Sequence, residues 1–356
     1  MTRHRRTSRT LGEARRFIER GRTAERIGSA GEALGWYDRA LASLMHSEPS
    51  NDLADVLRWK GTVHRECGDT AEADRLYRQS AEIAHTVGYA LGNAHALNCR
   101  AIVAECRGDL NLAEQLYRDA GEAAARAGDI RLSAMVERNL GVVACTRGQH
   151  DVALQRFGGS LQKAEEIDDH DGQCRSLNNI AMVYMAQRRY QDAEAAFSVA
   201  LDLARDRGDQ VVECVCRINR SEAMLAADRL SEAERECKLA LAIADRRGDR
   251  LRRAESLKLL AGIARRQDRF DDGEAMLREA FDLTDAGEDV LLAAELRRQM
   301  AEMFRARRQS NEASQFYREA QDLFRQSGAV RLAAEIDDSL RSLFVSSVTA
   351  PPPPPA

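Results

Sequence analysis

The chain has 356 residues, of which 44% are hydrophobic and 31% are charged, and its formal net charge at pH 7 is −4. This charge excludes a protein whose whole surface attracts polyanions, and the sequence has no apolar run long enough to cross a membrane. Eight scattered cysteines and a polar N-terminus are typical of a cytoplasmic protein with reduced thiols.

The N-terminal segment, residues 1–14, is predicted to be a basic flexible tail. It carries Arg3, Arg5, Arg6 and Arg9. Such a segment can act as an arm for nucleic acid or an acidic partner. A solvated tail without a function is the interpretation that we favour.

Residues 15–328 contain a repeat with a period of 40 residues. Small residues form one column, at Gly21, Gly61, Ala101, Gly141, Ala181, Ser221, Ala261 and Ala301. Alanine forms a second column from Ala33 to Ala313, with Gly273 as its exception, and a third runs Tyr37, Tyr77, Tyr117, Phe157, Phe197, Cys237, Leu277 and Tyr317. A register held over eight cycles indicates a tandem array of one supersecondary unit. No proline lies between Pro49 and Pro351, so we predict an all-α protein.

Each repeat is predicted to be a hairpin of two helices, A and B. In one cycle, helix A covers about 93–106 and helix B about 111–126, separated by Gly108-Asp109 and followed by Gly128-Asp129. Glycine provides the left-handed end of a helix, and aspartate caps the next one. We expect the small columns where helix A presses on helix B, and the aromatic column between successive hairpins. The pair Gly158-Gly159 interrupts one B helix, as a hinge, a close contact or a tolerated substitution.

The C-terminal part is predicted to end the array. Residues 329–344 follow helical spacing and would form a capping helix over the last hairpin. Residues 345–356 contain Pro351 to Pro355 and are predicted to be a disordered proline-rich tail. A polyproline segment can dock to an SH3-like groove, although a plain disordered end is favoured.

The repeat resembles the tetratricopeptide repeat. The block Leu140-Gly141, Gly148, Ala153, Phe157 and Ser160 has the family's spacing from the small residue of helix A to the alanine and aromatic residue of helix B. The resemblance implies a right-handed α-solenoid of about eight hairpins. The period of 40 exceeds the family's usual 34, and its usual proline is missing. The longer form is similar to repeats of peptide-binding adaptors and bacterial regulators.

The resemblance also implies that helix A lines a concave groove. Asn139, Asn179 and Asn219 form one column on that helix. Asparagine is a poor residue inside a helix, and its amide offers both a donor and an acceptor to a peptide backbone. Because peptide-binding members of the family use helix A asparagines in this way, we expect these three side chains to hold an extended peptide.

Neighbouring side chains would set the preference for a ligand. Asn98, Arg138 and Asn178 occupy the adjacent column, and Arg175 is expected nearby. Guanidinium groups pair with carboxylates, which favours an acidic segment or a free C-terminal carboxylate. Met182 and Met185 would add adaptable apolar contacts. Alternatively, the asparagines bond to adjacent helices and the arginines form a solvated face.

The sequence contains no phosphate-binding loop, nucleophile elbow or paired metal-binding histidines. We therefore predict a non-enzymatic protein without a cofactor or metal, acting as a protein-binding or peptide-binding scaffold or regulator. The alternative is a sensor arm of a bacterial signalling or transcription-control system that acts with a separate DNA-binding partner. Direct nucleic-acid binding is not expected, because no helix-turn-helix pattern lies outside the repeats. A homo-oligomer is compatible with either function.

Overall fold

The computed structural model describes residues 2–26, 28–45, 48–284, 290–326 and 329–348, and every regular element within these ranges is an α-helix. The helices are α1 (Thr2–Arg26), α2 (Ala30–Leu44), α3 (Asn51–Glu66), α4 (Thr70–Thr86), α5 (Ala90–Cys106), α6 (Leu110–Ala127), α7 (Ile130–Thr146), α8 (His150–Glu166), α9 (His170–Ala186), α10 (Tyr190–Asp206), α11 (Gln210–Ala226), α12 (Leu230–Arg247), α13 (Arg250–Arg266), α14 (Phe270–Thr284), α15 (Val290–Ala306), α16 (Ser310–Gln326) and α17 (Val330–Val348). None of these helices is both long and apolar enough to span a bilayer.

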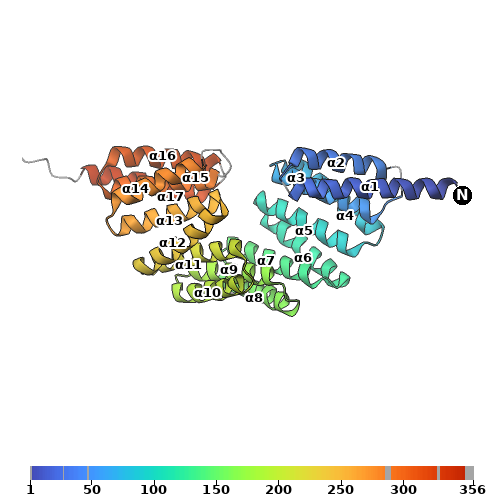
Figure 1. The fold of residues 1–356 in the computed structure, drawn as a ribbon, viewed down its shortest axis with the longest axis horizontal. Coiled ribbons are helices and arrows are strands. Elements are labelled where there is room, and N and C mark those ends of the chain that lie inside the picture. Colours follow the sequence, from blue (N-terminus) through green and yellow to red (C-terminus); the bar gives the residue numbers. More distant parts are fainter. Residues whose placement is uncertain (1, 27, 46–47, 285–289, 327–328, 349–356) are drawn as a thin grey trace, which may run out of the picture. The chain divides into compact units, whose positions relative to one another are not determined.

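The chain forms two compact units, Met1–Val183 and Tyr184–Ala356. Consecutive helices pack as antiparallel neighbours from α1 to α8 in the first unit and from α10 to α17 in the second (Figure 1). The A helices, which carry odd numbers, also contact one another: α1, α3, α5 and α7 in the first unit, and α11, α13 and α15 in the second. The predicted all-α solenoid of eight hairpins followed by a capping helix is confirmed.

Left-handed residues end the helices with the predicted chemistry. Gly108 and Gly128 have φ values of 78° and 70°, and the carboxylates of Asp109 and Asp129 accept hydrogen bonds from the third backbone N–H of the following helix. The turn inside each hairpin repeats every 40 residues with positive φ, at Gly28, Gly68, Gly108, Gly148, Arg188, Asp228, Asp268 and Arg308. The last four positions therefore hold a conformation that side chains disfavour.

The aromatic column packs against the small column of its own hairpin. A Cβ atom added at Gly61 would lie 2.8 Å from Cε1 of Tyr77, and one added at Gly141 would lie 2.5 Å from Cε1 of Phe157. Tyr77 also contacts Val103 of the next hairpin. The rings therefore contact the next hairpin, as we predicted, and also the small residue of helix A in their own hairpin. The small residue of helix A is what leaves room for the ring.

Three regions differ from the sequence prediction or extend beyond it. Residues 2–14 belong to helix α1 instead of an irregular tail, because arginine is a good helix former, no proline interrupts the segment, and a single glycine, Gly12, is tolerated. Helix α17 continues past 344 to Val348, while residues 349–356 lie outside the described part. A Cβ at Gly158 or Gly159 would meet nothing within 4 Å, so the close-contact interpretation of this pair is wrong.

Candidate functional site on the A helices

In the first unit, two of the predicted asparagines bind each other. Nδ2 of Asn139 on α7 donates to Oδ1 of Asn98 on α5 at 3.0 Å. Asn98 is only 3% exposed, so its amide joins adjacent A helices, as the structural alternative expected. Asn139 is half-buried and has a second N–H and a carbonyl oxygen beyond this bond. This residue can therefore link the helices and still contact a ligand.

Arg138, next to this pair on α7, is a half-buried cation that has no ion pair within the described part of the chain. Burial lowers the pKa of its guanidinium, and the charge of Arg175 acts in the same direction. Arg175 on α9 is exposed and pairs with Asp171 at 2.8 Å. The surroundings of Arg138 therefore favour an incoming anion more than those of Arg175.

The remaining predicted residues of the first unit lie on α9. Asn178 and Asn179 are half-buried, and Met182, one turn later, is 48% exposed. An exposed methionine beside two amides suits an adaptable apolar contact with a ligand. Met185, also half-buried, and Asn219 belong to the second unit.

The second unit has a hollow of about 250 Å³ between the A helices α11, α13 and α15. Its walls contain Asn219 of the predicted asparagine column together with Lys258 and Arg298 of the adjacent column. These residues come from three successive repeats and from two adjacent columns, so both columns contribute to one surface of this unit. The lining also includes Glu222 and Glu295.

Charges in this hollow are paired with one exception. Glu295 lies 2.9 Å from Lys258 and 3.6 Å from Arg298; burial alone would raise its pKa, but these two cations outweigh it and hold the pKa below its usual value. Arg265 pairs with Glu302 at 2.8 Å. Glu222 is the exception, because it has no ion pair among the described residues, and the partial exclusion of water in the hollow raises the pKa of its carboxyl. A ligand group that donates hydrogen bonds would satisfy this carboxylate.

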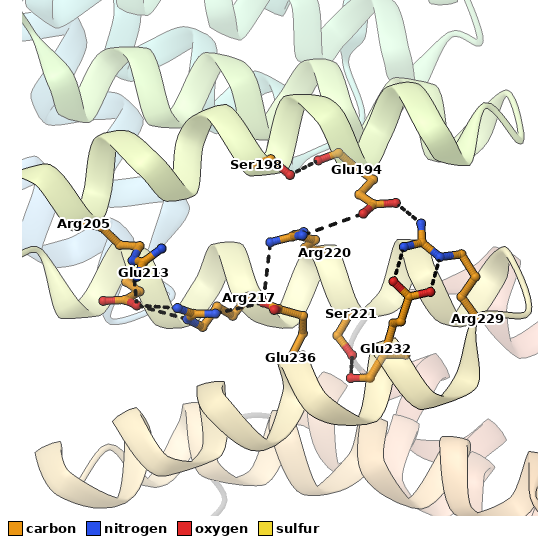
Figure 2. Close-up of polar contacts among 11 residues, drawn as sticks. Glu194, Ser198, Arg205, Glu213, Arg217, Arg220, Ser221, Arg229, Glu232 and Glu236 are labelled. Carbon is orange, nitrogen blue, oxygen red and sulfur yellow. Dashed lines mark hydrogen bonds and ion pairs between the residues drawn. The ribbon is translucent and has the colours of Figure 1, made fainter.

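A buried charge network, which the sequence analysis did not identify, joins α11 to the B helices α10 and α12. Figure 2 shows Arg217 of α11 between two carboxylates, with Glu213 at 2.9 Å and Glu236 of α12 also at 2.9 Å. Arg217 is 7% exposed and Glu236 is 6% exposed. Arg220 extends the network, lying 3.7 Å from Glu236 and 3.8 Å from Glu194 of α10. Ion pairs thus fix α11 against both neighbouring B helices.

This network could have been found by comparing Arg217 and Glu236 with the residues at the equivalent positions of the other repeats. Forty-residue equivalents of Arg217 and Glu236 include Leu97 and Leu116, which lie in the core of the third hairpin. Most members of the two columns are apolar, and the fourth hairpin has a second ion pair at the same positions, Glu137 with Arg156 at 3.0 Å. Opposite charges at paired positions of two mostly apolar columns indicate such ion pairs. Groups of three or more histidine, cysteine, aspartate or glutamate side chains that could hold a metal are absent from the part of the chain that the structure describes.

Residues 132–206 match the sequence model of the tetratricopeptide repeat, which confirms the resemblance inferred from the repeat columns. No curated protein sequence matches the chain significantly.

Several solved structures share the fold. The apo form of RapI superposes with a TM-score of 0.60 and 16% sequence identity, covering 77% of this chain and 98% of RapI. A Rap protein complexed with competence and sporulation factor gives 0.56 and 14%, covering 96% and 98%. The Rap conjugation gene regulator of plasmid pLS20, in complex with the Phr* peptide, gives 0.55 and 16%, covering 76% and 73%. At these identities the likeness establishes the fold alone.

Proposed function

We propose that this protein is a non-enzymatic regulator or scaffold that binds an extended peptide, or the tail of a partner protein, on its A helices. The observation that carries the proposal is the hollow on α11, α13 and α15, where Asn219, Lys258 and Arg298 of three repeats converge. The similarity in fold to a regulator solved with a peptide supports the same conclusion.

The asparagine column would hold the peptide backbone. Asn139, Asn179 and Asn219 each offer N–H donors and a carbonyl acceptor, which complement the C=O and N–H of an extended chain. The bond between Asn139 and Asn98 pre-orients the Asn139 amide, which lowers the entropy cost of binding. Each such hydrogen bond contributes about 1 kcal/mol to affinity.

Side chains beside the asparagines would set the preference. Arg138, without an ion pair of its own, would bind an acidic side chain or a C-terminal carboxylate, with Asn178 and Arg175 completing this position. Met182 and Met185 would contact apolar side chains of the peptide. In the second unit, Glu222 would accept hydrogen bonds from the ligand.

Alanine substitution tests the proposal in each unit separately. Asn139→Ala with Asn179→Ala alters the first unit, and Asn219→Ala alters the second. Asn311→Ala, at an exposed position of the B helix α16, is the matched control. Affinity for peptides captured by the wild-type chain from an acidic peptide library would be measured by isothermal titration calorimetry.

We expect each groove variant to bind about five-fold to thirty-fold more weakly, at about 1 kcal/mol per lost hydrogen bond, with unchanged circular dichroism. The control should bind like the wild type. Equal affinity in all variants would refute the assignment of the asparagines.

A further inference from the structure

The first hairpin carries a charge opposite to that of the rest of the protein. Residues 1–44 contain ten arginines and five acidic residues, whereas the rest of the chain contains 43 lysines and arginines and 52 acidic residues. Nine of the ten arginines belong to α1, whose 25 residues extend over about 37 Å at 1.5 Å per residue. A protein with a negative net charge therefore has one strongly basic helix.

The arginines of this hairpin are mostly not neutralised. Within the described residues, Arg16, Arg20, Arg22 and Arg39 make no ion pair, although ion pairs are frequent in the other hairpins. Arg15 is paired, with Asp52 of α3 at 3.0 Å. The positive field of the hairpin therefore reaches solvent.

The acidic residues of the hairpin are engaged elsewhere. Glu25 accepts a hydrogen bond from the Tyr37 hydroxyl at 2.6 Å, and Glu32 accepts one from the indole N–H of Trp36 at 3.2 Å. Asp38 pairs with Lys60 of α3 at 2.7 Å. Because three of the five carboxylates bind other donors, the guanidinium groups stay available.

Two tryptophans hold three of these arginines in place. The guanidinium carbons of Arg20 and Arg39 lie 4.7 and 4.5 Å from the centre of the Trp36 ring. That of Arg22 lies 4.9 Å from the centre of the Trp59 ring. Stacking on an aromatic face fixes the guanidinium plane and leaves the N–H groups at its edge to bind an oxyanion. Such pre-organisation reduces the entropy lost on binding.

The chemistry of this surface fits a nucleic acid better than a protein. Protein partners anchor on large apolar or aromatic side chains at the centre of an interface. Among the described residues of the first hairpin, the large apolar side chains are buried or half-buried, with Met45 at the end of α2 as the exposed exception. Arginine forks bind phosphate oxygens in pairs. The phosphates of a polymer can contact several unpaired arginines spaced along α1, such as Arg16 and Arg20 one turn apart, together with Arg39 of α2.

We infer that the first hairpin binds the phosphate backbone of a nucleic acid, independently of base sequence, through Arg20, Arg22 and Arg39 together with Arg16 of α1. This interaction is separate from the proposed peptide groove and does not depend on it. It also revises the expectation from total charge, since a net charge of −4 conceals a local excess of cations.

The test uses the full chain and a fluorescein-labelled 30-base-pair DNA duplex, with binding followed by fluorescence anisotropy between 50 and 200 mM KCl. The same measurement is made with single-stranded DNA and with duplex RNA of the same length. The polymer that binds with the highest affinity identifies the class of nucleic acid. The variant is R20Q/R22Q/R39Q. The matched control is R78Q/R118Q/R278Q, which removes three exposed arginines that are ion-paired in other hairpins.

We expect binding at 50 mM KCl that weakens with salt, with a slope of log K against log salt of about −3.6 or steeper for four or more phosphates. The R20Q/R22Q/R39Q variant should bind at least ten-fold more weakly, and its slope should be shallower by about 2.7. The control should bind like the wild type. If circular dichroism shows that the variant does not fold, R20K/R22K/R39K replaces it and should keep the slope while losing affinity.

Three results would overturn the inference. One is no binding to any of the three polymers at 50 mM KCl. Another is an equal loss of affinity in the two triple variants, which would reduce the effect to total charge. The third is competition by polyglutamate as strong as that by unlabelled duplex, which would assign the surface to an acidic protein.

Discussion

The buried pair of Arg217 and Glu236 permits a quantitative test of how this solenoid is held together. We would replace each residue by leucine, singly and together. The double variant recreates the arrangement of the third hairpin, where Leu97 and Leu116 occupy the equivalent positions. The same backbone therefore already accommodates leucine at both places.

Removing one partner of a buried ion pair typically costs about 3–5 kcal/mol, because the other charge is left buried. Here the remaining contacts reduce this cost: Arg217 keeps Glu213 at 2.9 Å, and Glu236 keeps Arg220 at 3.7 Å. We therefore expect each single variant to lose about 2–3 kcal/mol. The double variant removes both charges of the pair, while Glu213 keeps Arg205 at 3.9 Å and Arg220 keeps Glu194 at 3.8 Å. It should therefore lie within about 1 kcal/mol of the wild type.

The assay is urea unfolding followed by circular dichroism. Because repeat arrays can unfold in steps, free energies are compared only between variants whose transitions have the same dependence of unfolding free energy on urea concentration. Asp322 and Arg325, an exposed pair 3.8 Å apart, are the control and should show a coupling below about 0.5 kcal/mol. If the loss in the double variant equalled the sum of the two single losses, the charges would act independently and the reasoning would be refuted.

Other predictions follow from the turns, the core and the hollow. Gly141→Ala should cost about 1–3 kcal/mol by crowding Phe157, whereas Gly159→Ala, in open space, should gain up to about 1 kcal/mol; thermal melting distinguishes the two. Arg308→Gly should gain up to about 1 kcal/mol in urea unfolding, because φ is 62° at this position. The pKa of Glu222 is raised in the folded state, so ionisation as pH rises favours the unfolded chain; the stability of Glu222→Gln relative to wild type should therefore increase from pH 4 to pH 7, and a constant difference would contradict this.

The fold could be predicted from the sequence because the same pattern of small, alanine and aromatic positions recurs in eight repeats. Gly108-Asp109 and Gly128-Asp129 specify a left-handed turn and a helix cap, and the structure has both. The helical state of residues 2–14 was not predicted, because their charge was taken as the sign of a solvated tail and the helix propensity of the arginines was not weighed against it.

Contacts between hairpins could be predicted less well. The column analysis located Asn139, but the bond to Asn98 depends on the relative rotation of α5 and α7, which periodicity does not specify. The pair of Arg217 and Glu236 was missed because their two columns, whose members are mostly apolar, were not among those that the repeat analysis considered. Opposite charges in the same repeat at two mostly apolar columns indicate a contact between the two helices, which the majority residues of these columns do not.

The turn inside each hairpin keeps its spacing from Gly28 to Arg308 without a single insertion or deletion. A gene that encodes such a chain can gain or lose a block of 40 codons by unequal recombination between repeats, and every turn, cap and core column on either side of the junction would stay in phase. The length of the proposed peptide-binding surface would then change in whole steps of one A helix.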